Sequence, residues 1–220
     1  MIFTILGKSG SGKSYLGREI TNKLTGYTKN NPLNNTFTQS KKLFIFDESY
    51  DHVNLGDISV LKLDNDIIKK INTDKLIEKY ERLLINTEFV TETDLLKDFI
   101  NRFSKSVWNQ GNIILLVDEA HIYYPERQPA EELEKLLKIS RKRGIDIIFI
   151  TQQFRDIRKA AINQCSVLCL GKFFGINEIE TAKKYGITKD MVLGLNKYEF
   201  IFIDAWDSGQ VEILENKEAI

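Results

Sequence analysis

A glycine-rich segment near the start of the chain has the residue types needed to bind phosphate. Residues 7–14 read Gly-Lys-Ser-Gly-Ser-Gly-Lys-Ser and fit the pattern G-x-x-x-x-G-K-[ST] at every position. Glycines let the backbone wrap so that successive N–H groups point at phosphate oxygens. In this pattern Lys13 supplies a cation to the β- and γ-phosphates, and the Ser14 hydroxyl binds Mg²⁺. We expect ATP to be held by Gly7, Lys8, Ser9, Gly10, Ser11, Gly12, Lys13 and Ser14.

Two acidic residues follow the most aliphatic segment of the chain. Asp118 and Glu119 directly follow residues 112–117. Two acids after a strand would alone indicate an ordinary solvated strand end. Beside a phosphate-binding loop, Asp118 is placed to accept from a Mg²⁺-bound water, and Glu119 to polarise a lytic water as general base. We therefore predict that Ser14 and Asp118 form the metal site, that Asp118 contacts the nucleotide through it, and that Glu119 and Lys13 are catalytic.

A second apolar segment also ends in polar residues. Residues 145–150 are followed by Thr151, Gln152 and Gln153. If this strand lies beside the phosphate-loop strand, Gln152 sits at the γ-phosphate as a sensor, and we include it among the catalytic residues. Asn196-Lys197-Tyr198-Glu199 departs from the guanine-reading pattern N-K-x-D at its last position, which favours ATP. His121 completes the letters D-E-A-H, but a DEAH helicase needs two motor domains and this chain has length for one.

Strands alternate with helices along the chain, which predicts an α/β fold with a mainly parallel sheet. Expected strands are 2–6, 43–46, an edge strand at 60–63, 112–117, 145–150, 167–170, and a C-terminal β-hairpin of 200–204 and 211–214 around residues 207–209. Expected helices are 13–24, 74–85, 94–110, 129–143 and one from 177 to about 186. Residues 26–42 are rich in Asn and Thr and predict a long surface loop. We expect residues 1–220 to form a single domain.

The composition narrows the class of protein. The 220 residues carry 31 Lys and Arg against 31 Asp and Glu, so the net charge is zero and binding of nucleic acid by bulk electrostatics is disfavoured. No apolar run approaches the ~20 residues of a membrane span, and the first residues do not resemble a secretion leader. Cys165 and Cys169 lie on one predicted strand far from either histidine, which indicates buried structural thiols. We expect a cytoplasmic protein.

With these segments in hand, the chain resembles the HerA–FtsK superfamily of P-loop ATPases. The segment from 113 to 153, with its acid pair, helix, basic turn, strand and Thr-Gln, is the most diagnostic part. Single-domain viral genome-packaging ATPases look most similar. The resemblance implies a RecA-like P-loop NTPase core flanked by helices, a homo-oligomeric ring (usually a hexamer) and translocation of double-stranded DNA without sequence preference. A capsid vertex protein is an expected docking partner, and association with the virion an expected location.

The resemblance also implies an arginine supplied in trans by the neighbouring subunit. Arg141 and Arg143 are the first candidates because they stand at the matching place, and Arg155 and Arg158 are the second. The alternative is that the basic residues 141–143 form the solvated last turn of a helix, where positive charge complements the helix dipole. Possible DNA contacts are Lys29, Lys41 and Lys42 in one loop and Tyr123, Tyr124 and Arg127 in another; the tyrosines could equally be packing residues.

Two other functions remain open. A Zot-like factor, acting in phage assembly or secretion on protein partners, is the main alternative, although those proteins carry a membrane-spanning segment that we do not find here. A small-molecule kinase is disfavoured because no Arg-rich lid follows the last helix.

Overall fold

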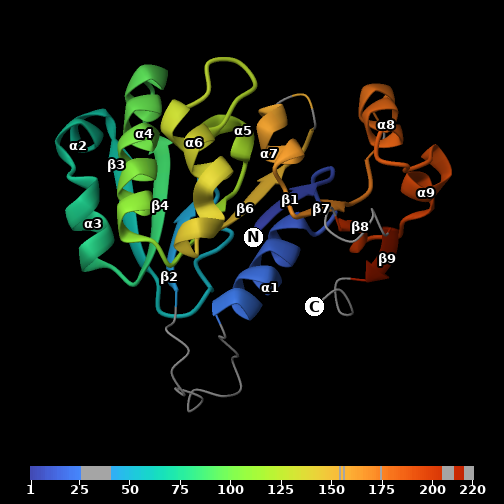
Figure 1. Ribbon diagram of the computed structural model, residues 1–220, viewed down its shortest axis with the longest axis horizontal. Coiled ribbons are helices and arrows are strands. Elements are labelled where there is room, and N and C mark those ends of the chain that lie inside the picture. Colours follow the sequence, from blue (N-terminus) through green and yellow to red (C-terminus); the bar gives the residue numbers. More distant parts are fainter. Residues whose placement is uncertain (26–40, 154, 156, 174, 205–210, 216–220) are drawn as a thin grey trace, which may run out of the picture.

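The fold is taken from a computed structural model, which describes residues 1–25, 41–153, 155, 157–173, 175–204 and 211–215. One twisted sheet runs through the molecule with helices on either side (Figure 1). Its nine strands in the described residues follow the order β3-β4-β2-β5-β6-β1-β7-β8-β9. All neighbouring strands are parallel except the last two pairs, β7 with β8 and β8 with β9.

The element bounds follow the chain. The strands are β1 Ile2–Leu6, β2 Lys42–Phe46, β3 Ser59–Asp64, β4 Arg82–Phe89, β5 Ile113–Val117, β6 Asp146–Thr151, β7 Val167–Leu170, β8 Glu199–Asp204 and β9 Val211–Glu215. The helices are α1 Lys13–Thr25, α2 Asn65–Lys70, α3 Thr73–Lys79, α4 Thr93–Gln110, α5 Ala120–Tyr123, α6 Glu131–Ile139, the 3-10 helix η1 Ser140–Arg143, α7 Lys159–Asn163, α8 Ile176–Lys183 and α9 Lys189–Gly194. The α/β class, the mainly parallel sheet and the C-terminal hairpin are confirmed.

Two apolar layers hold the sheet between its helices. Alternate side chains of each strand point to opposite faces. Leu16 and Ile20 of α1 pack on one face against residues such as Ile114 and Ile148. The other face carries the larger layer, to which α2 to α9 contribute. It includes an aromatic cluster of Phe44, Phe46, Phe99 and Phe103 with ring centroids 5.2 to 6.2 Å apart. Because the central strands are covered on both faces, they are almost wholly aliphatic.

The largest error of the sequence prediction concerns the expected helix 74–85. Helix α3 ends at Lys79, and β4 begins at Arg82 between β3 and β2. Leu83, Leu84 and Ile85 are fully buried there. A short apolar run fits a buried strand as well as a helix, and only its neighbours in space decide between them.

Smaller corrections concern helix boundaries. Helix α2 was not expected; Asp64 caps it by accepting from the backbone N–H groups of Asp66 and Ile67. The helix expected at 129–143 is split into α6 and η1. Helix α4 begins at Thr93, one residue before the expected start. Within α1, Tyr15 is 41% exposed.

Some expectations fall on parts of the chain that the structure does not describe. These are the loop 26–40, with Lys29, and the hairpin turn at 207–209. Among the described residues, no helix combines the length and apolar character needed to cross a membrane.

Candidate nucleotide-binding site

The phosphate-binding loop connects β1 to α1 at the carboxyl end of the parallel strands. Gly10 and Gly12 have φ angles of 76° and 95°, which side chains rarely tolerate. A Cβ atom at Gly7 would lie 2.7 Å from the Ser11 hydroxyl, so glycine is needed there for the tight turn. The Lys8 N–H donates to the Lys172 carbonyl at 3.0 Å, which fixes the loop to the segment after β7.

Lys13 lies inside this loop. Its ammonium donates to the Lys8 carbonyl at 3.0 Å, and the residue is 7% exposed. Burial lowers the pKa of Lys13, while the negative charges of Glu119, Asp118 and Asp51 act to raise it. The Lys13 ammonium thus shares the pocket with three carboxylates, and phosphate oxygens bound in the loop would lie next to it.

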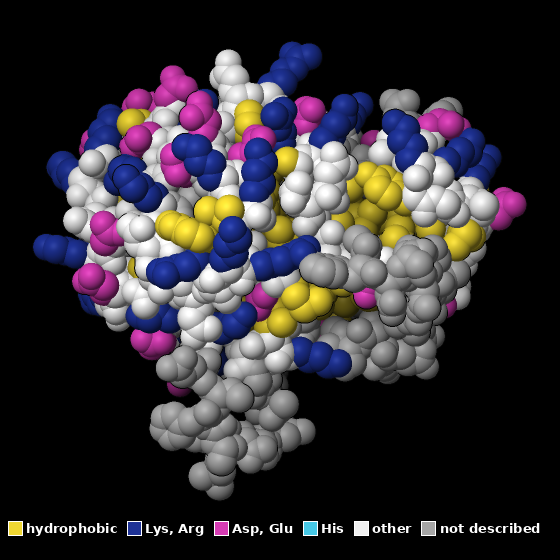
Figure 2. Space-filling view, viewed as in Figure 1, with side chains coloured by type: hydrophobic (Ala, Val, Ile, Leu, Met, Phe, Trp, Pro, Cys, Tyr) yellow, Lys and Arg dark blue, Asp and Glu magenta, His cyan; other side chains and the backbone are white. Residues whose placement is uncertain are grey.

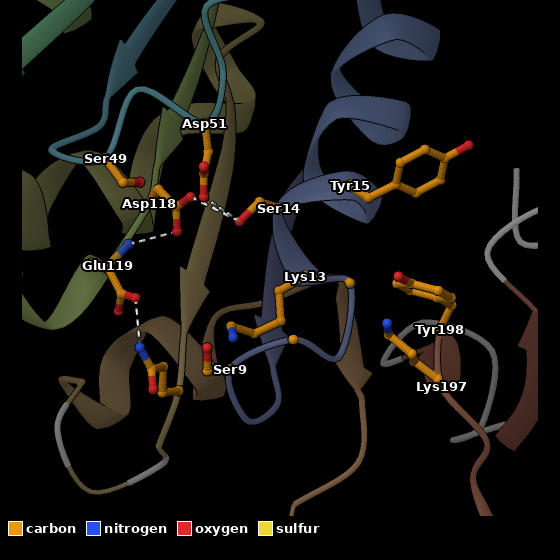
Figure 3. A pocket seen from close by; sticks show the side chains of 13 residues that line it. Ser9, Lys13, Ser14, Tyr15, Ser49, Asp51, Asp118, Glu119, Lys197 and Tyr198 are labelled. Carbon is orange, nitrogen blue, oxygen red and sulfur yellow. Dashed lines mark hydrogen bonds between the residues drawn. The ribbon is translucent and has the colours of Figure 1, made fainter.

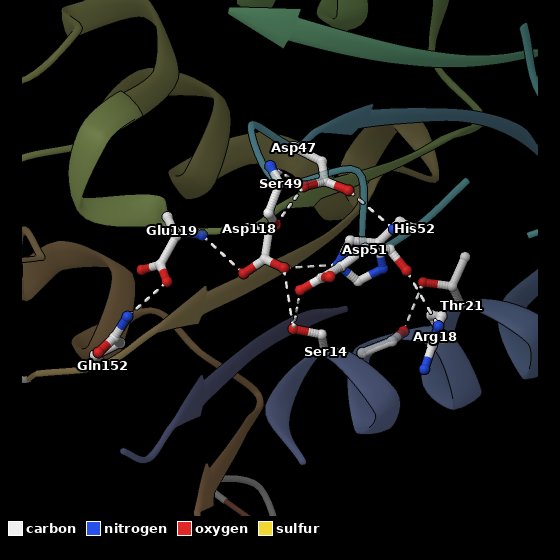
Figure 4. A network of polar contacts seen from close by, with 11 residues as sticks. Ser14, Arg18, Thr21, Asp47, Ser49, Asp51, His52, Asp118, Glu119 and Gln152 are labelled. Carbon is white, nitrogen blue, oxygen red and sulfur yellow. Dashed lines mark hydrogen bonds and ion pairs between the residues drawn. The ribbon is translucent and has the colours of Figure 1, made fainter. Parts of the chain in front are cut away.

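Asp118 sits at the centre of a polar network (Figure 4). Its Oδ2 accepts from the Ser14 hydroxyl at 3.2 Å and contacts His52 Nε2 at 2.7 Å, and its Oδ1 accepts from the Glu119 N–H at 2.8 Å. Burial acts to raise the pKa of Asp118, but the hydrogen bond and charge of His52, with the bonds from Glu119 and Ser14, hold it below its usual value. An ionised carboxylate only accepts, so His52 Nε2 carries the proton in this contact.

Sequence reasoning missed several site residues, Asp51 among them, and the most deeply buried of these is His52. It is fully buried, and its backbone N–H donates at 2.9 Å to the carboxylate of Asp47, which directly follows β2. The other Asp47 oxygen accepts from the Ser49 N–H and hydroxyl at 2.9 and 3.0 Å. Asp47 thereby fixes a loop that brings His52 onto Asp118. The only sequence signal was an acid at the end of a buried strand, since no motif links residues 52 and 118.

Glu119 has an unusual backbone. Its φ and ψ are 45° and 51°, the left-handed region that favours glycine. Gln152 Nε2 donates to Glu119 Oε1 at 2.7 Å, and Glu119 Oε2 lies 3.4 Å from His121 Nδ1. Strand β6 lies between β5 and β1, the strand order on which the Gln152 prediction depended, and Gln152 lines the same pocket as the phosphate loop. Strained backbone at a polar site is typical of functional positions.

These side chains line an open pocket of about 290 Å³ (Figure 3). Ser14, Asp118 and Asp51 supply a hydroxyl and two carboxylates, with Asp51 Oδ2 3.5 Å from the Ser14 hydroxyl. An all-oxygen donor set is what Mg²⁺ prefers, so these residues fit that ion. The pocket is completed by Ser9, Gly10, Gly12, Lys13, Tyr15, Ser49, Glu119, Gln152, Lys197 and Tyr198.

The two candidate arginines lie apart from this pocket. Arg141 and Arg143 belong to η1, which precedes β6 and therefore lies at the opposite edge of the sheet. Arg143 donates to the carbonyls of Trp108 and Asn109 at the end of α4 and lies 5.5 Å from the Trp108 ring centroid. Arg141 donates to the Ser166 hydroxyl at 3.4 Å. Within one subunit, neither reaches the pocket.

Most of the candidate DNA contacts are occupied within the chain. Tyr123 and Tyr124 are buried: Tyr123 bonds the Thr87 hydroxyl at 2.8 Å, and Tyr124 stacks on Phe149 with centroids 5.8 Å apart. Both are packing residues, the alternative that the sequence left open. Lys41 pairs with Asp146 at 2.6 Å, and Lys42 donates to the Ile77 carbonyl at 2.9 Å. Arg127 is exposed.

Residues 49–208 match the model of the zonular occludens toxin (Zot) family. The chain belongs to the Zot family. The matched range includes the acid pair and Gln152, and it begins after the phosphate loop. Comparison with curated proteins gives no significant match.

Solved structures similar to this Zot-family chain share its fold at low sequence identity. One is the genome-packaging NTPase B204 of Sulfolobus turreted icosahedral virus 2 bound to ATPγS, at 17% identity and a TM-score of 0.70, covering 97% of this chain and 96% of that one. Another is VirB4 of Thermoanaerobacter pseudethanolicus, at 11% identity and a TM-score of 0.68, covering 97% and 88%. The type VII secretion ATPase EccC of Thermomonospora curvata covers 97% of this chain and 23% of that one, at 15% identity and a TM-score of 0.58. The Zot-family chain therefore has the P-loop NTPase fold.

Proposed function

We propose that this chain is an ATP-hydrolysing motor that assembles into a homo-oligomeric ring and translocates double-stranded DNA, as in viral genome packaging. One observation carries the proposal: Lys13, Ser14, Asp118, Glu119 and Gln152 meet around one phosphate-binding loop. A fold shared along nearly the whole chain with the viral packaging NTPase B204 supports it. We further propose that residues 1–220 form a single P-loop ATPase domain.

The side chains divide the chemistry among them. The loop amides and Lys13 hold the phosphates and neutralise their charge. Ser14 and Asp118 would hold Mg²⁺, whose charge would offset that of the phosphates. Glu119 accepts a proton from the attacking water through Oε2, while Gln152 donates to Oε1 and His121 Nδ1 lies 3.4 Å from Oε2; together these two side chains orient the carboxylate.

Formation of a ring would complete the site. A cation from a neighbouring subunit is the usual way to stabilise charge developing at the γ-phosphate. Arg141 and Arg143 stay our candidates because, within the chain, they lie away from the pocket and at a different edge of the sheet. DNA contact without sequence reading, a capsid vertex protein as docking partner, and location in the host cytoplasm or on the virion belong to the same proposal.

ATP hydrolysis with and without double-stranded DNA tests this proposal. We expect Lys13→Ala and Glu119→Gln to abolish hydrolysis, with a loss of about 10²- to 10⁴-fold for removal of a general base. Glu119→Gln should still bind ATP. Parental activity in that variant would show that Glu119 is not the base.

The arginines need a test that separates catalysis from folding. Because Arg143 also caps the carbonyls at the end of α4, Arg143→Ala should cost some stability as well as activity. Mixing Arg143→Ala subunits, which retain the pocket, with Lys13→Ala subunits, which retain the arginine, should restore hydrolysis if the arginine acts in trans. No restoration at any mixing ratio would contradict that role.

The family match favours a second candidate, a nucleotide-dependent assembly or secretion factor acting on protein. VirB4 and EccC have the same fold, and EccC is a type VII secretion ATPase. Hydrolysis that double-stranded DNA stimulates favours the translocase, and hydrolysis indifferent to DNA favours the assembly factor.

A further inference from the structure

Two exposed tyrosines border the pocket on the side away from Glu119. Tyr15 is 41% exposed and Tyr198 is 47% exposed, and both line the pocket. Figure 3 places them together on one side of the phosphate loop, with Glu119 and Asp118 on the other. No other described tyrosine is exposed to this degree. Neither ring contributes to the core, because neither belongs to an apolar layer of the sheet.

The turn that carries Tyr198 is well fixed. The Glu199 carboxylate accepts from the Asn196 backbone N–H at 2.6 Å and from its side-chain amide at 2.9 Å, which closes the turn before β8. Tyr198 has a φ of 72°, a conformation that costs energy for a residue other than glycine. The Lys197 ammonium lies 4.7 Å from the Tyr198 ring centroid. The turn therefore presents a large ring to solvent at the edge of the pocket, at some cost in backbone energy.

The direction in which a nucleotide lies in the pocket decides which part of it these rings face. The terminal phosphate of a bound nucleotide lies toward Glu119, Asp118 and Gln152, where the general base Glu119 and the metal ligands are. The ribose and base must then leave on the other side of the loop, toward Tyr15 and Tyr198 (Figure 3). Stacking on an aromatic ring accepts any base because every base has a π-face.

We propose that Tyr15 and Tyr198 form the nucleobase subsite of this pocket and hold a purine by stacking on its ring faces. This inference rests on the proposed function. Glu199 stands where a guanine-reading pattern has its acid, but both of its carboxylate oxygens are engaged by Asn196, and these hydrogen bonds lower the pKa of Glu199. Glu199 is therefore not available to read a base edge, and the subsite holds the bases of ATP and GTP alike through their ring faces.

Calorimetric titration with ATP, GTP and inorganic tripolyphosphate, each with Mg²⁺, tests the subsite. Tripolyphosphate has the phosphates without the base. Tyr198→Asn removes the ring with a residue that tolerates positive φ, and Tyr198→Phe keeps the ring. Tyr15→Ala removes the second ring. Phe89→Ala is the matched control, since this exposed aromatic residue ends β4 near the opposite end of the sheet.

We expect Tyr198→Asn and Tyr15→Ala each to weaken ATP and GTP binding at least about fivefold, as for loss of one base–aromatic stack, and to change tripolyphosphate binding less than about twofold. Tyr198→Phe should recover most of the affinity lost in Tyr198→Asn, and Phe89→Ala should bind like the parent. Equal weakening of ATP and tripolyphosphate, or no weakening of ATP, would overturn the subsite while leaving the ATPase proposal intact. A parent chain that binds neither ATP nor tripolyphosphate would instead overturn the proposed function and the subsite with it.

Discussion

His52 provides the most demanding test of how the site is built. Its ring is fully buried, and Nε2 lies 2.7 Å from Asp118 Oδ2. In His52→Ala the hydrogen bond to an ionised carboxylate is lost, a loss of about 1.5–3 kcal/mol. Removal of a buried ring also leaves a cavity. Together these effects predict that the free energy of unfolding falls by about 3–5 kcal/mol.

The same substitution should weaken the metal site. Asp118 keeps its contacts with Ser14 and with the Glu119 N–H but loses the partner that orients Oδ2. Loss of an outer-shell partner typically reduces metal affinity about 10- to 100-fold. We therefore expect the Mg²⁺ concentration for half-maximal ATPase activity to rise at least about tenfold. Binding of the nucleotide base should change little, because Tyr15 and Tyr198 lie on the other side of the loop.

Two measurements and two further variants make this prediction refutable. Urea unfolding followed by circular dichroism gives the stability, and ATPase titration with Mg²⁺ gives the metal requirement. His52→Gln can still donate to Asp118 and should recover part of both losses. His121→Ala is the control, since that side chain is 37% exposed and should change stability by less than about 0.5 kcal/mol. Equal effects of His52→Ala and His121→Ala on stability, or an unchanged Mg²⁺ requirement in His52→Ala, would refute the reasoning.

Three further predictions concern the acid, the thiols and the helix packing. The folded-state pKa of Asp118 lies below its unfolded value of about 4, so the stability that its ionised form contributes is present above pH ~4 and is lost as the pH falls through the folded pKa. Urea unfolding between pH 2 and 6 should therefore show a loss of stability at acid pH, and this loss should be smaller in Asp118→Asn. Burial raises the pKa of Cys165 to about 12 and that of Cys169 well above its usual value, so neither should react with a thiol reagent at pH 8 until the chain is unfolded in urea. A Cβ at Gly17 would lie 2.5 Å from Ile150 Cδ1, so Gly17→Val should cost about 1–3 kcal/mol of stability in thermal unfolding.

The sequence predicts the parts of the site whose residues are neighbours along the chain. The phosphate loop and the acid pair each follow a strand directly, so their order alone places them at one edge of a parallel sheet. Gln152 needed one further assumption, the position of β6 between β5 and β1, and the sheet order confirms it.

The rest of the site depends on contacts that no local pattern encodes. His52 reaches Asp118 only because Asp47 fixes the intervening loop. Tyr15 has helical spacing with the buried residues of α1, yet it is exposed at the pocket. Strand β4 was mistaken for part of a helix because its apolar run is as compatible with one period as with the other.

Imaging by negative-stain electron microscopy, with an ATP analogue and double-stranded DNA, tests the central claim most directly. The proposal of a ring motor predicts closed rings of equal subunits around a channel wide enough for a duplex, with DNA passing through it. It also predicts fewer rings for Lys13→Ala, which lacks the cation in the phosphate loop. A particle that stays a monomer at every protein concentration, with analogue and DNA present, would contradict the motor.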